Sequence, residues 1–308
     1  MTKIGLGLAA LGRPEYINIR ENKDLDKSES SFKKNAFDML DTAYSINIHY
    51  FDTAPSYGKG EEFLKEWQNK NNHTNTVLAT KWGYTYVANW ELGYKGAHEI
   101  KEHSIEKLIE QWETSKVMIP ALKVYQIHSA TLESGVLENN KVLKKLSEIK
   151  KETGLQIGLT TSGPNQEIVL KEAASIKINN QFLFDVFQVT YNVFEQSTFN
   201  TLVDLIRKGK NIVIKEGIAN GRIFKNTPTL LTDLALKHNV GIDAIALRFI
   251  IDSLQPYIVL SGAFTKHQLQ ENLKCLTIKL TSDELKTLST LETKKETYWS
   301  ERKELSWN

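Results

Sequence analysis

Cysteine is the scarcest reactive residue in the sequence, because only Cys275 among 308 residues carries a thiol. A single cysteine excludes an internal disulfide framework and a cysteine-rich metal centre, so we expect no metal site. The sequence also has almost no excess of positive or negative charge, because 39 Lys and Arg residues balance 37 Asp and Glu residues to give a net charge of +2. Nucleic-acid-binding proteins usually carry a basic stripe, and here the lysines are mixed with glutamates, so we expect no nucleic-acid partner.

Long hydrophobic runs are missing too. The first apolar stretch, residues 4–11, is short, is interrupted by glycines and is followed by Arg13 and Pro14. It is too short for a signal peptide, and no later stretch reaches the length of a membrane span. We therefore expect a cytoplasmic chain with no membrane partner. With 41% apolar and 25% charged residues, the composition is that of an ordinary globular protein with a sizeable core.

Short apolar runs alternate with amphipathic helical segments along the chain. Eight runs rich in β-branched residues predict strands at 4–8, 48–51, 76–80, 122–127, 155–159, 184–189, 211–214 and 257–260. Helices between such runs imply parallel strands, and eight units in about 300 residues favour a parallel eight-stranded (β/α)₈ TIM barrel over an open sheet. No linker interrupts the series, which predicts one domain over residues 1–308, with a polar tail from about 292 to 308.

Titratable side chains stand at the ends of three successive predicted strands. Asp52 follows the second strand, Lys81 the third and His128 the fourth, while Tyr57 lies in the loop after Asp52. Each could be structural on its own: a turn cap, a surface phenol, a solvated charge, a hydrogen-bonded core histidine. In a barrel, however, the carboxyl ends of the strands form the functional face, so their joint occurrence favours an active site.

Three strings around these residues, FDTAPSYG, LATKWG and YQIHSA, closely resemble the aldo-keto reductase family. The resemblance extends from Ile4 to about Asn272. It implies a (β/α)₈ barrel that reversibly reduces an aldehyde, ketone or sugar carbonyl with a nicotinamide cofactor.

The resemblance also gives the four titratable residues their roles. Carbonyl reduction needs a hydride at carbon and a proton at oxygen. A phenol is a weak acid, with a pKa of ~10, and a neighbouring ammonium lowers that value. Tyr57 is therefore expected to be the acid/base, Lys81 the charge that lowers its pKa, and Asp52 the partner of Lys81. His128 is expected to donate a hydrogen bond to the substrate oxygen.

Cofactor contacts are implied for the second half of the chain. Thr160 and Thr161 stand where the family has Ser-Asn at the nicotinamide carboxamide, Gln188 matches the family glutamine, and Lys215 replaces a stacking aromatic ring. The expected pyrophosphate grip and adenosine contacts are Gly217, Ile218, Asn220, Gly221, Arg222, Gly262, Glu271 and Asn272.

The family favours NADPH, and NADH is the alternative because Gly262 and Gln268 replace basic residues, although Lys266 and His267 lie close by in the sequence. An aromatic loop, residues 82–98, should overhang the pocket, with Trp82 as a pocket wall. Two other functions stay open: a cofactor-binding sensor with little turnover, and a lyase or isomerase that uses no nicotinamide. The phosphate-loop pattern disfavours the latter.

Overall fold

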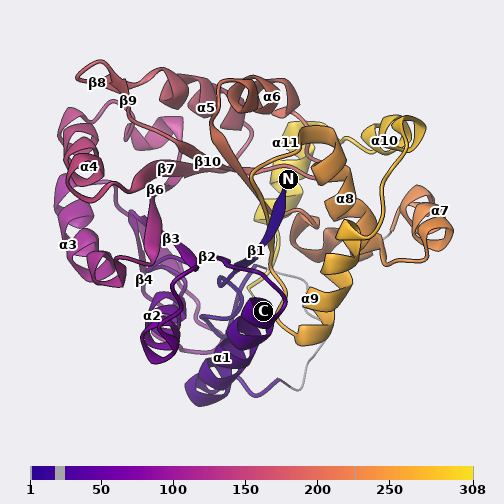
Figure 1. Cartoon of the computed structure of the whole chain (residues 1–308), viewed down its shortest axis with the longest axis horizontal. Coiled ribbons are helices and arrows are strands. Elements are labelled where there is room, and N and C mark those ends of the chain that lie inside the picture. Colours follow the sequence, from indigo (N-terminus) through magenta and orange to yellow (C-terminus); the bar gives the residue numbers. More distant parts are fainter. Residues whose placement is uncertain (1, 18–24, 226, 308) are drawn as a thin grey trace.

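Eight parallel strands close into a barrel in the computed structural model, which describes residues 2–17, 25–225 and 227–307 (Figure 1). Around the barrel they run β1 (Lys3–Gly7), β2 (Tyr50–Asp52), β3 (Val77–Trp82), β6 (Leu122–Ala130), β7 (Gln156–Thr161), β10 (Val186–Thr190), β11 (Asn211–Lys215) and β12 (Ile258–Ser261). The predicted TIM barrel is confirmed, with every predicted strand present at shifted bounds.

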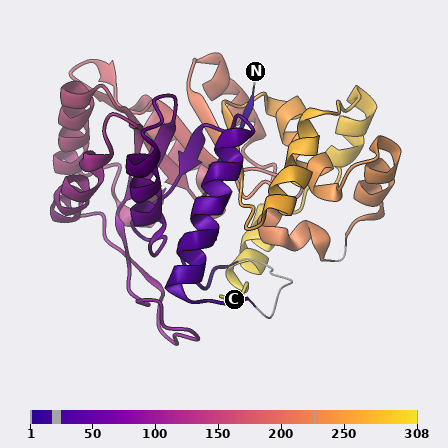
Figure 2. The same ribbon diagram turned by 60° about the horizontal axis from the view of Figure 1, so that its bottom comes forward.

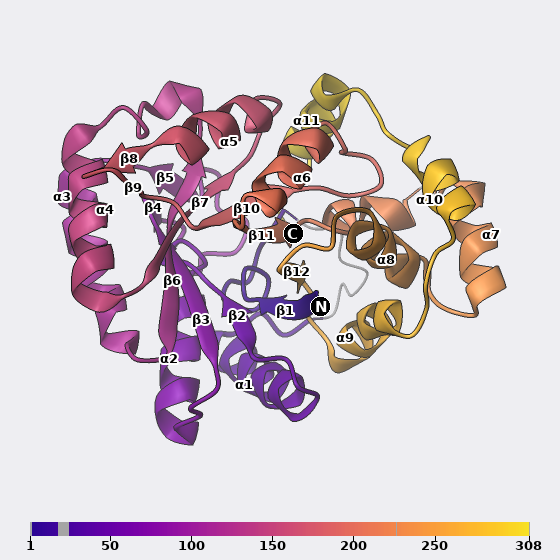
Figure 3. The same ribbon diagram turned by 45° about the horizontal axis from the view of Figure 1, so that its top comes forward.

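Helices surround the strands, and Figure 3 shows them outside the curved sheet. They are α1 (Glu29–Ser45), α2 (Gly60–Asn71), α3 (Ile105–Ser115), α4 (Asn140–Thr153), α5 (Gln166–Ser175), α6 (Phe199–Arg207), α7 (Thr229–His238), α8 (Ile242–Leu254), α9 (Lys266–Leu273), α10 (Ser282–Ser289) and α11 (Lys295–Lys303). Side-chain N-caps at Ser28, Ser104 and Asn139 fix where three of them begin. No helix in the described part of the chain is long and apolar enough to cross a membrane.

Two segments differ from their predictions. The expected aromatic loop contains β4 (Tyr84–Tyr86), which pairs antiparallel with β5 (Glu99–Lys101), so helix α3 begins only at Ile105. In Figure 2 this hairpin projects from the lower edge of the molecule, the edge at which the chain also ends. The expected polar tail contains α11, whose Tyr298 and Trp299 are buried. Both elements lie over the carboxyl ends of the barrel strands.

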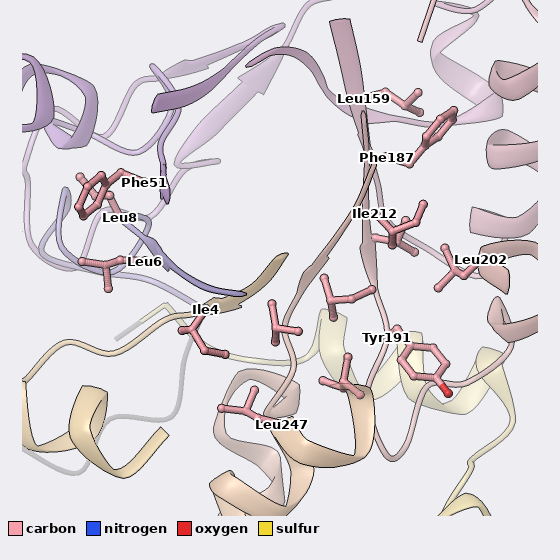
Figure 4. Packing of buried hydrophobic residues seen from close by; sticks show 14 of the residues in the cluster. Ile4, Leu6, Leu8, Phe51, Leu159, Phe187, Tyr191, Leu202, Ile212 and Leu247 are labelled. Carbon is pink, nitrogen blue, oxygen red and sulfur yellow. The ribbon is translucent and has the colours of Figure 1, made fainter. Parts of the chain in front are cut away.

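Strand alternation divides the apolar residues into two groups. Side chains that point outward, such as Phe187 and Ile212, pack against the helices, where α6 contributes Leu202 (Figure 4). The side chains that fill the amino end of the barrel interior form a separate, smaller cluster: Tyr50, Ala79, Val124, Val186, Val213, Ile258 and Leu260. A Cβ at Gly5 would come within 3.0 Å of the Tyr50 ring, so glycine makes room for the largest member.

Polar side chains fill the other end of the same interior. Because strand side chains repeat every two residues, the position two beyond each apolar interior residue also points inward. On five of the six strands that carry the cluster this position is polar, and it holds Asp52, Lys81, Gln126, Gln188 and Lys215. On β12 it is apolar and holds Leu260. The barrel therefore has an apolar floor and a polar layer directly above it.

Candidate active site

Asp52 connects strands from opposite sides of the barrel. Its Oδ1 accepts a hydrogen bond from Lys81 Nζ at 2.5 Å, and its Oδ2 accepts one from Gln188 Nε2 at 2.7 Å. Lys81 also donates to the Thr53 carbonyl at 2.9 Å and has no solvent exposure. A buried charge pair with these additional hydrogen bonds is held in one geometry, as Asp52 was expected to hold Lys81.

Tyr57 stands above this pair. Its loop is joined to the loop after β1 by a hydrogen bond from Lys59 N to the Gly12 carbonyl at 2.7 Å. A Cβ at Gly12 would lie 2.2 Å from the Tyr57 carbonyl, so only glycine permits this approach. The Lys81 ammonium lies 4.7 Å from the centroid of the Tyr57 ring, and the Arg13 guanidinium lies 5.2 Å from it.

The expected fall in the pKa of Tyr57 is wrong for this arrangement. Burial, followed by the charge of Asp52, raises the pKa of Tyr57 well above its usual value, and Arg13 opposes the rise. Because Lys81 is paired with Asp52, the pair presents little net positive charge to the phenol. Tyr57 is therefore a protonated donor at neutral pH.

His128 packs edge-on against Tyr57, with ring centroids 5.5 Å apart. Its Nδ1 lies 3.3 Å from Ser56 Oγ. Burial, and then the charges of Lys81 and Arg13, lower the pKa of His128 well below its usual value, so the imidazole is neutral. A neutral imidazole still donates one hydrogen bond, which suits the expected role at a substrate oxygen.

A β-bulge sets the position of His128 at the barrel rim. The pairing of β6 with β7 shifts between Ile127 and Ala130, and Ser129 has a φ of +52°. The Ser129 amide donates to Thr160 Oγ1 at 2.7 Å, and His103 Nε2 donates to the His128 carbonyl at 2.9 Å. These two hydrogen bonds fix the backbone on both sides of the bulge. Bulges are common next to active sites, where they change the direction of a side chain.

One cavity of about 410 Å³ opens above the polar layer. Its wall contains most of the predicted site: Asp52, Tyr57, His128, Thr160, Gln188, Lys215, Gly217, Ile218, Asn220 and Gly262. Lys81 lies behind Asp52, out of the wall. Three of the four expected catalytic residues thus line one cavity, and Lys81 joins them through its hydrogen bond to Asp52.

Several expected cofactor residues do not line this cavity. Thr161 is fully buried, and its hydroxyl donates to Gln166. Asn272 is engaged by Ser261 and Asp243, since its Oδ1 accepts from the serine hydroxyl and its amide donates to the aspartate. The remaining three are Gly221, Arg222 and Glu271.

Trp82 is not a pocket wall, contrary to expectation. It directly follows the inward-pointing Lys81 on β3, so its ring points out of the barrel, has no solvent exposure and packs against His103. Two residues further on, Tyr84 lines the cavity instead, with its ring 4.8 Å from that of His128.

The segment after β11 has an unusual backbone. Glu216, Ala219, Asn220 and Gly221 all have φ between +50° and +85°. Two of its buried polar atoms, Asn220 Oδ1 and Arg222 Nη2, lack a hydrogen-bond partner within the described ranges. Buried polar atoms are normally paired, so these two fit a ligand with polar groups.

Lys215 points into the cavity at the end of β11. Its Nζ donates to Thr190 Oγ1 at 2.9 Å. Burial lowers the pKa of Lys215 to about 8; Glu216 opposes the shift and Arg302 adds to it. A lysine that titrates near neutral pH therefore stands where the resemblance expected a neutral ring.

Sequence reasoning missed the residues at the mouth of the cavity. Arg13, Tyr84, Glu99 and Trp307 all line it, from the loop after β1, the hairpin and the C-terminal segment. The one local signal was Gly12 next to Arg13, which marks a close backbone approach. No group of three or more His, Cys, Asp or Glu side chains in the described residues could hold a metal ion.

The chain is similar to known oxidoreductases. It is 22% identical over 289 residues to an aryl-alcohol dehydrogenase of Pestalotiopsis microspora. The aligned region covers 83% of this chain and 72% of that protein. It is 23% identical over 314 residues to the uncharacterized oxidoreductase YqkF of Bacillus subtilis, which covers 91% and 97% of the two chains.

Solved structures share the fold. The holo form of the aldo-keto reductase AKR11C1 from Bacillus halodurans superposes with a TM-score of 0.67 at 18% identity, over 95% of this chain and 92% of that one. The thermostable aldo-keto reductase Tm1743, in complex with the inhibitor epalrestat, gives 0.68 at 22% identity over 94% and 95%. The model of the Aldo/keto reductase family matches residues 3–293. This protein therefore belongs to the aldo/keto reductase family.

Proposed function

We propose that the protein reduces an aldehyde, ketone or sugar carbonyl to the alcohol, or catalyses the reverse, with a nicotinamide cofactor. The observation that carries this proposal is the meeting of Tyr57, His128 and the Asp52–Lys81 pair at one end of one cavity. A donor phenol, a neutral imidazole and a fixed charge pair are what proton delivery to a carbonyl oxygen requires. We keep the cytoplasmic location as a prediction from the sequence.

In this proposal Tyr57 gives its proton to the oxygen as the carbonyl is reduced. His128 donates a hydrogen bond to the same oxygen and orients it, because its ring lies against that of Tyr57. Lys81 and Asp52 form part of the polar layer beneath, and the charge of Arg13 favours the phenolate that Tyr57 becomes.

The cavity residues fit a dinucleotide. Thr160 and Gln188 line the cavity with Asp52 and are available for a carboxamide. In the segment after β11, whose Gly217, Ile218 and Asn220 line the cavity, the unpaired Arg222 Nη2 can donate to a pyrophosphate. Gly262 leaves open space, since a Cβ built there meets no atom within 4 Å. When bound, the nicotinamide supplies or accepts the hydride. We propose NADPH as the cofactor, with NADH as the alternative.

The test is a fluorescence titration of the purified protein with NADPH and NADH, followed by measurement of their oxidation with aliphatic, aromatic and sugar aldehydes. Aromatic aldehydes belong in the panel because one relative is named an aryl-alcohol dehydrogenase. Binding with turnover of at least one carbonyl supports the proposal. Failure to bind either nucleotide would refute it.

Lys215 gives a specific reason to test a second function. A charged side chain replaces the ring expected at the nicotinamide, which could leave a cofactor-binding sensor with little turnover. Tight binding of a nucleotide with no oxidation by any carbonyl would support the sensor instead of the reductase.

A further inference from the structure

Arg13 and Glu99 form a part-buried ion pair in the wall of the cavity. Nη1 of Arg13 lies 2.5 Å from Oε1 of Glu99, and both residues line the cavity wall. Arg13 is only 2% exposed, and the side chain of Glu99 is 18% exposed. The guanidinium carbon lies 5.2 Å from the Tyr57 ring, so a substrate that reaches Tyr57 with its carbonyl also meets this pair.

The guanidinium group is held rigidly. It lies 4.5 Å from the centroid of the Tyr16 ring and 4.9 Å from that of Trp307. Its Nε donates to the Ala9 carbonyl at 3.3 Å, and its Nη1 also donates to the Ser56 carbonyl at 3.1 Å. A planar cation fixed between aromatic rings keeps its remaining N–H groups aimed in one direction.

One donor and one acceptor of the pair remain free for a ligand. Within the described residues, Nη2 of Arg13 and Oε2 of Glu99 make no hydrogen bond, whereas Nε, Nη1 and Oε1 are all used. A hydroxyl group can accept from Nη2 and donate to Oε2 at the same time, because it has both a proton and lone pairs. A carboxylate can only accept, and it would stand beside the negative charge of Glu99.

Resting on the proposed function, we propose that Arg13 and Glu99 form a specificity pair that selects an uncharged carbonyl compound bearing a hydroxyl group near the carbonyl. The pair has no net charge, so binding a neutral hydroxyl group leaves no charge unpaired. A carboxylate would be repelled by Glu99, so the pair disfavours a carbonyl compound that carries one. Glu99 is thus the residue that prevents Arg13 from selecting acids.

The first experiment compares kcat/KM for three four-carbon aldehydes: butanal, 3-hydroxybutanal, which adds a hydroxyl group at C3, and 4-oxobutanoate, which has a carboxylate in place of the methyl group. We expect 3-hydroxybutanal to exceed butanal by roughly tenfold or more, since a site built to pair a hydroxyl rejects an analogue that lacks it. We expect 4-oxobutanoate to be the poorest of the three. A wild-type preference for 4-oxobutanoate would overturn the proposal.

Substitution separates the two members of the pair. Glu99→Gln keeps the shape and removes the negative charge, so the ratio of kcat/KM for 4-oxobutanoate to that for butanal should rise by roughly tenfold or more. Arg13→Gln should lose the preference for 3-hydroxybutanal and gain nothing for the acid. Glu91→Gln, an exposed carboxylate of the same hairpin outside the cavity wall, is the matched control and should leave both ratios unchanged. An unchanged acid ratio in Glu99→Gln would overturn the proposal.

A binding measurement keeps this test separate from the proposed function. Quenching of tryptophan fluorescence can report binding of butan-1-ol, butane-1,3-diol and 4-hydroxybutanoate, because Trp307 borders the pair. If no aldehyde is reduced, the reductase proposal fails, while tighter binding of the diol than of the other two ligands still supports the pair. Equal binding of all three ligands would refute the pair even in an active enzyme.

Discussion

Tyr57 is a half-buried phenol in the cavity wall, and its surroundings determine the pH range in which it can donate a proton. Burial and the nearby Asp52 raise its pKa well above the usual value. A group with a raised pKa keeps its proton up to a higher pH, so the donor form should persist throughout the range from pH 6 to 9. Deprotonation of Tyr57 should therefore not lower the rate of carbonyl reduction between pH 6 and 9, which a pH profile of kcat measures.

Removal of the Tyr57 hydroxyl should separate binding from turnover. Tyr57→Phe keeps the ring that packs against His128, so nucleotide affinity should stay near that of the wild type, while kcat should fall by ~10²–10⁴-fold. Tyr86→Phe is the matched control, because Tyr86 lies outside the cavity wall. A Tyr57→Phe variant with full turnover would show that another group donates the proton.

Lys215 should make cofactor binding depend on pH. With a pKa of about 8, its side chain is positive below pH 8 and neutral above it. The oxidised nicotinamide ring carries a positive charge, so Lys215 should weaken its binding relative to the reduced form at low pH. We define the affinity ratio as the affinity for the reduced cofactor divided by that for the oxidised cofactor. Fluorescence titration should give a ratio about tenfold larger at pH 6.5 than at pH 9.5.

Lys215→Met removes the charge and keeps an unbranched chain of similar length. The affinity ratio in this variant should be the same at both pH values. If the variant keeps the pH dependence of the wild type, another group is responsible.

At the level of single residues, the sequence identified the centre of the site and missed its mouth. Asp52, Lys81 and His128 each lie in the carboxyl-terminal part of a strand, so their place near the barrel rim is a local property of the sequence. Arg13 and Glu99 are 86 residues apart and lie beyond the strand ends, and their contact depends on how two loops fold over the barrel. No periodicity encodes that path.

Among the elements, α11 is joined to the segment after β11 by a part-buried ion pair, in which the Glu216 side chain is 7% exposed and that of Arg302 is 20% exposed. Arg302 donates to Glu216 through Nε and Nη2, with the closest contact at 2.5 Å. Burial alone would raise the pKa of Glu216, but the charges of Arg302 and Lys215 outweigh it and lower the value to about 2. Because the folded value is below the unfolded one, this pair should contribute stability above about pH 4.5 and lose it as the pH falls toward 2.

Glu216→Gln should therefore destabilise the protein by about 3 kcal/mol at pH 7, because it leaves Arg302 without its buried partner. Urea unfolding gives the free energy. Asp204→Asn is the control, since its i,i+4 pair with Lys208 is solvent-exposed and should contribute ~0–1 kcal/mol. Equal losses of unfolding free energy in the two variants would contradict a stabilising role for the Arg302–Glu216 pair.

The sequence did not predict α11, and the reason is physical. Its nine residues, KETYWSERK, are mostly polar, and the apolar side chains of Tyr298 and Trp299 are adjacent rather than spaced along one face. The helix forms because Tyr298 and Arg302 have partners on the barrel: the Tyr298 hydroxyl accepts from Asn192, and Arg302 pairs with Glu216. Tertiary contacts of this kind override a weak local pattern.

For the whole molecule, the sequence was sufficient to predict the closed barrel. Eight strands alternating with helices leave few arrangements that bury every strand on both faces. The same two-residue repeat that builds the apolar floor from Tyr50 and Val213 builds the polar layer from Asp52 and Lys215 above it. The barrel and the polar layer of the candidate site depend on the same two-residue repeat, so a prediction of the strands also predicts which polar side chains point inward.

The charge pair in that layer should show that stability and catalysis are separable. Lys81 is fully buried, so Asp52→Asn leaves an unpaired interior ammonium and should cost about 3–5 kcal/mol in the free energy of unfolding. Lys81→Met leaves the opposite charge unpaired and should cost a similar amount. The double variant Asp52→Asn/Lys81→Met has no unpaired charge, so urea unfolding should show that it regains at least half of either loss. Carbonyl reduction should not return, because the Asp52–Lys81 pair beneath Tyr57 is still missing. A double variant whose loss equals the sum of the two single losses would mean that Asp52 and Lys81 do not act as a pair.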